Sequence, residues 1–214
     1  MKCGITTIIL DVDGTLTDDV SWLPLTAGLG ADPKIHEKIF DDFKAGKHSY
    51  SDAKKQLIKL WQNTGNANKG FMKSMFQAWK LKCDTRETID YLKKSYRLCL
   101  ISGAVDLYIK IVAKKLGISD WYANTELIWD NKGNLVDFNY FADQAQKKLE
   151  QFNKFAKKYN LDKEECVIVG DGDSDLVLFR ELKHGIAVNK DPNPDLESLS
   201  SKRISKLIEL KNLL

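Results

Sequence analysis

One short segment constrains this chain more than any other, because it places two acidic residues at the end of an apolar run. Residues 9–15 read Ile-Leu-Asp-Val-Asp-Gly-Thr, with carboxylates at Asp11 and Asp13. A continuous apolar stretch bounded by a turn signal is typical of a buried strand in a parallel sheet. Ligands of open α/β sheets bind at the carboxyl ends of such strands. We therefore expect both acids at a functional site at the tip of a central strand; the alternative is a turn that happens to be acidic.

The rest of the chain alternates strand and helix patterns, as an α/β protein with a parallel sheet requires. Apolar runs at residues 97–102, 166–170 and 185–188 predict three further core strands. Helical periodicity at 104–116 and at 142–159 predicts two of the connecting helices. The fold class that we expect is α/β, with a Rossmann-like parallel sheet as its core.

Three weaker patterns give further expectations about local structure. Residues 127–136 predict a β-hairpin around an Asn-Lys-Gly turn. Asp84 and Glu87 have the spacing of a capping box that starts a helix. The apolar residues that follow Leu196 predict an amphipathic helix over the tail.

Residues 18–84 interrupt this alternation with helical patterns alone. Asp32 followed by proline is expected to start one helix, and Ser51 is expected to cap a second. We expect a helical cap domain over 18–84, inserted after the first strand, and a core domain formed by 1–17 and 85–214.

A hydroxyl group follows the second apolar run. Ser102 and Gly103 come directly before a predicted helix, where a hydroxyl and backbone N–H groups would bind an anion. The alternative, left open by these residues alone, is that the serine only caps the helix.

Three acids follow the run at 166–170. Asp171, Asp173 and Asp175 offer the hard oxygen ligands that Mg²⁺ takes. A Ca²⁺ loop starting at Asp171 is excluded, because its twelfth position is Leu182 rather than a bidentate glutamate.

A lysine in the predicted helix 142–159 is a candidate partner for these acids. Lys148 lies three residues after Ala145 and four before Phe152, so it shares the apolar face. Lys147 instead lines up with Gln151 on the face expected to be solvated. We therefore favour Lys148.

The bulk composition excludes several function classes. The 33 basic and 30 acidic residues leave a net charge of +3, and no basic stripe suggests a nucleic-acid partner. No apolar run approaches the length of a membrane span. The 4 cysteines lack Cys-x-x-Cys spacing, which favours a reducing cytoplasm and disfavours a zinc site. The oligomeric state stays open.

Taken in order, the motifs Asp-x-Asp-Gly-Thr, Ser-Gly, a helical lysine and Gly-Asp-Gly-x-x-Asp resemble the haloacid dehalogenase superfamily. The closest resemblance is to its phosphoserine-phosphatase-like branch, which carries a small helical cap after the first strand. This resemblance implies a Mg²⁺-dependent phosphomonoester hydrolase that acts through an aspartyl-phosphate on a small phosphorylated metabolite.

The resemblance also implies a role for each residue of the site. Asp11 would be the nucleophile, and Asp13 the acid and base that serves the leaving group and the water. The expected phosphate ligands are Ser102, Gly103 and Lys148. The expected metal ligands are Asp11, Asp13 (through its backbone carbonyl) and Asp171, with Asp175 in a supporting role.

Two departures from the branch concern the substrate. A glutamate nine residues after the nucleophile and an arginine in the cap hold the amino acid in phosphoserine phosphatases, whereas Val20 occupies the first position here and residues 18–84 contain no arginine. We therefore expect phosphoserine not to be the preferred substrate. The alternatives to a hydrolase are a phosphotransferase or phosphomutase with the same site, and a non-catalytic phosphate-binding domain.

Overall fold

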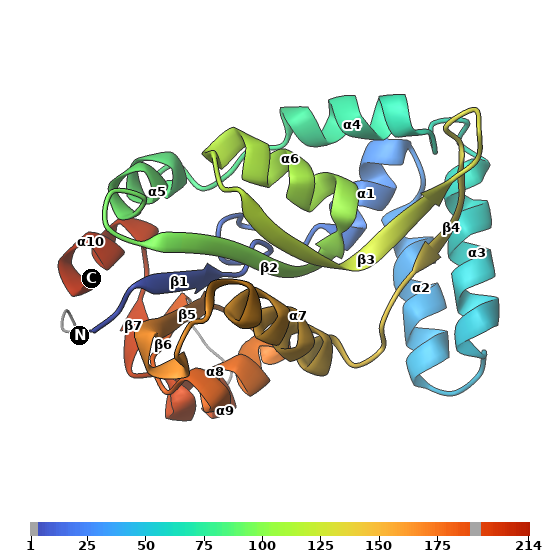
Figure 1. The fold of residues 1–214 in the computed structure, drawn as a ribbon. Coiled ribbons are helices and arrows are strands. Elements are labelled where there is room, and N and C mark those ends of the chain that lie inside the picture. The colour runs from blue at the N-terminus through green and yellow to red at the C-terminus, as the bar shows by residue number, and fades with distance from the viewer. Residues whose placement is uncertain (1–3, 189–193) are drawn as a thin grey trace. The chain divides into compact units, whose positions relative to one another are not determined.

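The computed structural model of this protein describes residues 4–188 and 194–214. The chain forms two compact units (Figure 1). The larger unit consists of the described residues of three segments, Met1–Asp18, Lys80–Thr125 and Tyr140–Leu214. The smaller unit consists of two segments, Asp19–Trp79 and Glu126–Asn139. Within the described ranges, no helix is both long and apolar enough to cross a membrane.

A seven-stranded sheet has the order β4-β3-β2-β1-β5-β6-β7. Its strands are β1 (Thr7–Leu10), β2 (Arg97–Val105), β3 (Asp120–Trp129), β4 (Leu135–Asn139), β5 (Cys166–Gly170), β6 (Gly185–Val188) and β7 (Lys202–Ile204). The expected central position of β1 is confirmed, and it pairs in parallel with both β2 and β5. The parallel α/β class is therefore confirmed.

Helices cover both faces of the parallel strands in the larger unit. They are α5 (Thr85–Leu92), α6 (Asp106–Leu116), α7 (Gln144–Tyr159), α8 (Leu176–Leu182), α9 (Pro194–Leu199) and α10 (Leu210–Leu213). In Figure 1, α5 and α6 lie on one side of the strands and α7, α8 and α9 on the other. Phe152 and Phe155 of α7 pack into a buried core with residues of β1, β2 and β5.

Two local expectations in this unit were wrong. The tail is not one helix, because Ser201 donates its backbone N–H to Gly185 and the next residues add β7 to the exposed edge of β6. The capping box at the start of α5 is absent as well. The Asp84 carboxylate makes no cap hydrogen bond and instead accepts from the backbone N–H of Ile208.

The smaller unit contains four helices and a hairpin. The helices are α1 (Trp22–Leu29), α2 (Pro33–Lys44), α3 (Tyr50–Gln62) and α4 (Lys69–Ala78). Asp32 caps α2 as expected, but Ser49 rather than Ser51 caps α3. The predicted hairpin is confirmed, and Gly133 in its turn has a φ of 84°. Residues 126–139, expected with the core domain, belong to this unit.

An aromatic cluster fills the centre of the smaller unit. The rings of Trp22 and Trp61 are stacked with their centroids 6.2 Å apart, and Phe138 lies 5.8 Å from Trp61. The Trp61 indole donates to the Thr26 hydroxyl at 2.8 Å, and that hydroxyl lies 2.7 Å from Nδ1 of His36. These hydrogen bonds give the buried polar groups partners inside an apolar cluster.

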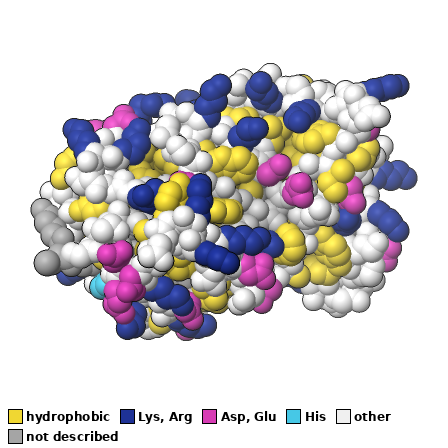
Figure 2. All heavy atoms as spheres, in the orientation of Figure 1, with side chains coloured by type: hydrophobic (Ala, Val, Ile, Leu, Met, Phe, Trp, Pro, Cys, Tyr) yellow, Lys and Arg dark blue, Asp and Glu magenta, His cyan; other side chains and the backbone are white. Residues whose placement is uncertain are grey.

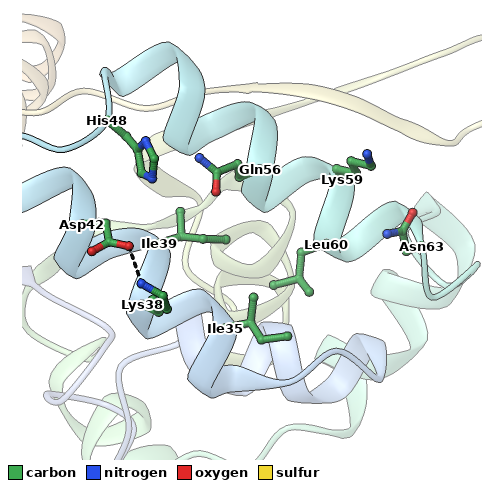
Figure 3. Close-up of a pocket in the computed structure, with 9 residues that line it drawn as sticks. All are labelled: Ile35, Lys38, Ile39, Asp42, His48, Gln56, Lys59, Leu60 and Asn63. Carbon is green, nitrogen blue, oxygen red and sulfur yellow. Dashed lines mark hydrogen bonds and ion pairs between the residues drawn. The ribbon is translucent and has the colours of Figure 1, made fainter.

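A groove between α2 and α3 lies on the surface of the smaller unit (Figure 3). Ile35, Ile39 and Leu60 provide apolar side chains, and polar residues surround them. Lys38 on its rim is paired with Asp42 at 2.7 Å. The acids singled out in the sequence are not among the residues that line this groove, so the groove is not the predicted site.

Candidate active site

The parallel register brings the acidic strand ends together. Leu10 of β1 is aligned with Leu100 of β2 and with Val169 of β5. The residues that follow this row therefore emerge at one edge of the sheet, which is the edge where α/β proteins bind ligands. Asp11 and Asp171 lie there, each directly after one of two adjacent strands.

Three carboxylates form one cluster at this edge. Single oxygens of Asp11, Asp171 and Asp175 all lie within 4.8 Å of one another. Asp11 and Asp175 are buried and Asp171 is half-buried. Asp173, the other acid of this segment, is exposed and does not belong to the cluster.

Lys148 is the positive partner of the cluster. Its side chain is completely buried, and its ammonium lies 2.7 Å from Asp175 and 3.1 Å from Asp11. The expectation from helical phase that Lys148 faces inward is confirmed. Lys147 points elsewhere, pairing with Glu150 at 3.1 Å and lying over the ring of Phe141.

The position of Gln151 differs from the one expected from the helical periodicity of α7. It was expected on the solvated face of α7 beside Lys147, yet it is buried. The reason is a hydrogen bond from its side-chain amide to the backbone carbonyl of Ala123 in β3, at 3.0 Å.

Two glycines allow the acids to approach the backbone. A Cβ atom at Gly14, whose φ is +73°, would lie 2.1 Å from a carboxylate oxygen of Asp171. At Gly170, a Cβ would lie 2.5 Å from the carboxylate of Asp175. No other residue fits these positions without displacing an acid, which explains the glycines of the two motifs.

The charges of this cluster fit a bound cation. Burial raises the pKa of Asp171 to about 6, and the negative charge of Asp175 acts in the same direction. Burial, with the charge of Asp171, also raises the pKa of Asp11, although Lys148 and the Val12 N–H oppose this. Burial alone would lower the pKa of Lys148, but Asp11 and Asp175 together raise it. Three carboxylates thus face one buried ammonium, and hard oxygen donors with excess negative charge suit a divalent ion such as Mg²⁺.

The other predicted site residues, Asp13, Ser102 and Gly103, follow or belong to the central strands, and the expected setting of the last two is corrected. Asp13 is half-buried in the turn after β1, and Ser102 is completely buried in β2. Ser102 and Gly103 were expected at a helix N-terminus, but β2 continues to Val105 and α6 begins only at Asp106. The backbone N–H groups beside Ser102 are therefore those of a strand end with a register irregularity, not of a helix.

Sequence reasoning missed several residues at this edge. The Thr15 hydroxyl donates to Asp171 at 2.7 Å and so holds that acid against the turn. Asn124 donates to the side chain of Gln144 at 2.7 Å, and the same Gln144 oxygen lies close to Gly103. Thr15 lies inside the first motif, so its position was a usable signal. Asn124 and Gln144 are 20 residues apart and carry no such signal.

Comparison with known proteins agrees with this arrangement. A family model described as haloacid dehalogenase-like hydrolase matches residues 5–182. A phosphoserine phosphatase of Methanocaldococcus jannaschii is 26% identical over 186 residues, which cover 84% of this chain and 83% of that protein. A phosphoserine phosphatase of Archaeoglobus fulgidus is 23% identical over 85% of this chain but only 52% of its own length.

Solved structures show the same fold. The phospho-aspartyl intermediate analogue of a phosphoserine phosphatase has a TM-score of 0.73 and 23% identity, covering 98% of this chain and 99% of that one. A hydrolase from Salmonella enterica serovar Typhi has a TM-score of 0.80 and 16% identity, covering 99% of this chain and 72% of that one.

Proposed function

Because the chain belongs to the haloacid dehalogenase-like hydrolases, we propose that it is a Mg²⁺-dependent phosphatase that acts on a small phosphorylated metabolite through an aspartyl-phosphate on Asp11. The observation that carries this proposal is the buried contact of Lys148 with both Asp11 and Asp175, beside a third carboxylate. Buried ionisable groups that contact one another and have shifted pKa values gather at catalytic sites.

Asp11 is the nucleophile in this proposal. Its carboxylate forms a bond to phosphorus while the ester oxygen leaves, and Asp13 donates a proton to that oxygen. Asp13 then takes a proton from water as the water attacks the phosphorus, which breaks the bond to Asp11 and releases phosphate. The Val12 N–H, which donates to Asp11 at 2.7 Å, fixes the orientation of the nucleophile.

Asp11, the backbone carbonyl of Asp13 and Asp171 would hold the Mg²⁺. When bound, the cation keeps Asp11 ionised and offsets the negative charge of the phosphoryl group. Asp175 is less suited to this role, because one of its oxygens already accepts from Lys148 and the other from the backbone N–H groups of Asp171 and Gly172. Its task is to orient the lysine.

Lys148 and Ser102 would bind the oxygens of the phosphoryl group. An ammonium has three N–H donors, and two of them face Asp175 and Asp11. The third is available for an anion, in a buried place where such a contact is stronger than in water. The Ser102 hydroxyl would add a neutral donor from β2.

The face drawn in Figure 2 agrees with a small-molecule substrate rather than a nucleic acid. Lysines and arginines are scattered over that face among acidic and hydrophobic side chains, rather than gathered in one stripe. We also infer a reducing, cytoplasmic location, which the three free cysteines among the described residues support.

The test is turnover of p-nitrophenyl phosphate with Mg²⁺, with EDTA and with Ca²⁺. We expect activity with Mg²⁺ alone, and inhibition by Ca²⁺ because its larger and looser coordination misplaces Asp11. Full activity in EDTA would contradict the metal assignment. Transfer of phosphate to added alcohols in preference to water would indicate a phosphotransferase instead.

A further inference from the structure

Lys82 lies next to the proposed site and has no role in the mechanism above. It follows the return of the chain from the smaller unit, which ends its first segment at Trp79. Its ammonium donates to the backbone carbonyl of Gly14 at 2.6 Å, and its backbone N–H donates to the carbonyl of Leu16 at 2.9 Å. Lys82 thus binds the turn after β1 at two points.

The neighbours of Lys82 connect it to the acidic cluster. Gly14, whose carbonyl it holds, is the residue against which Asp171 packs, and Thr15 donates to the same acid. The positive charges of Lys148 and Lys82 both act on Asp171, and Lys148 in addition contacts Asp11 and Asp175. Lys82 is therefore a second positive charge that acts on the cluster, through the turn that Asp171 packs against.

We propose that Lys82 is a second basic residue of this site, which positions the Gly14 turn and whose charge weakens cation binding and strengthens phosphate binding. The inference rests on the proposed function in one respect, which is that a divalent cation and a phosphate group bind at this cluster. Lys82 touches neither reacting atom, so it is a positioning residue rather than a catalytic one.

If the charge of Lys82 acts on the site, its removal changes the affinities for a cation and for an anion in opposite directions, which a purely structural role would not do. Removal of a half-buried positive charge favours a nearby cation and disfavours a nearby anion. A turn that merely loosened would bind both ions less well. The two ion affinities must therefore change in opposite directions if the charge of Lys82 acts on the site.

The experiment compares Lys82→Gln, which keeps a donor but removes the charge, with Lys80→Gln, the same change at an exposed lysine two residues away. Calorimetry measures the dissociation constant of Mg²⁺ and, at saturating Mg²⁺, that of inorganic phosphate. For Lys82→Gln we expect phosphate binding to weaken roughly ten-fold, because a nearby unit charge in a half-buried place is lost, and Mg²⁺ binding to tighten. Lys80→Gln should leave both constants unchanged.

Two results would overturn the role of Lys82: no change in either constant, or weakening of both in a folded variant. Lys82→Arg keeps the charge and should retain wild-type phosphate affinity, so a loss as large as that of Lys82→Gln also contradicts the proposal. A wild-type protein that binds neither Mg²⁺ nor phosphate contradicts the proposed function instead, which separates the two failures.

Discussion

At the scale of a single residue, the buried Lys148 shows that this fold contains a charged site in its interior. Its side chain has no exposure, and burying a lone ammonium costs several kcal/mol unless paired carboxylates offset it. Asp11 and Asp175 provide that pairing. Apolar residues would fill the same space with less desolvation, so stability alone does not explain a lysine here.

Replacement of Lys148 should lower the activity far more than replacement of its neighbour Lys147. We expect Lys148→Ala to lower kcat by roughly 10²–10³-fold, the usual loss for one buried donor to a developing anion. Lys147→Ala should lower it by no more than about two-fold, since a half-exposed ion pair contributes little. The measurement is kcat for both variants, with circular dichroism to confirm folding. Equal losses in two folded variants would show that the helical phase does not assign the role.

The hydrogen-bonded cluster of the smaller unit makes a prediction at the scale of elements. Burial lowers the pKa of His36 to about 4, below its ordinary value of 6.5. The unfolded chain therefore takes up a proton at a higher pH than the folded unit does. This contribution to stability is complete above about pH 6.5 and is lost as the pH falls toward about 4.

We expect the wild-type urea midpoint of unfolding to fall between about pH 7 and about pH 5 more steeply than that of His36→Gln, which cannot titrate. Asp42 also has a lowered pKa, but of about 2, so its titration lies below this window. Parallel pH dependences in the two proteins would mean that His36 is protonated in the folded state as easily as in the unfolded one.

The elements also show what local sequence patterns could and could not predict. Buried apolar runs gave β1, β5 and β6, because such strands are apolar on both faces. The amphipathic helix expected over the tail was wrong, because Ser201 pairs with β6 and the apolar residues belong to short, separate elements. The helix expected directly after Ser102 begins later, because β2 continues past a glycine that normally signals a turn.

At the scale of the whole molecule, the prediction concerns the choice of substrate. Its two segments contain lysines but no arginine, so they lack the group that binds a carboxylate in bidentate fashion. A free ammonium and carboxylate on the substrate would need buried partners of opposite charge. Phosphoserine should therefore not be the best substrate, although similar proteins are named phosphoserine phosphatases.

A panel of phosphomonoesters, compared by kcat/KM, checks this expectation. Preference for L-phosphoserine by about ten-fold, or about 1.4 kcal/mol of transition-state binding, would show that an unassigned residue recognises the amino acid.

The motif residues of the site were predictable from the sequence because parallel register brings strand ends together. Lys82 and Asn124 were not, since their contacts join segments 68 and 20 residues apart without a motif.

The central claim is that the phosphoryl group of the substrate is carried by Asp11. The most direct measurement is peptide mass spectrometry of the enzyme, quenched in acid during turnover, with borohydride reduction to mark an acyl phosphate. We expect a peptide in which borohydride has converted the phosphorylated Asp11 to homoserine, and no such peptide from the Asp11→Asn variant, which should be inactive yet folded. Turnover by Asp11→Asn at the wild-type rate, or a phosphoryl group on a different residue, would contradict this claim.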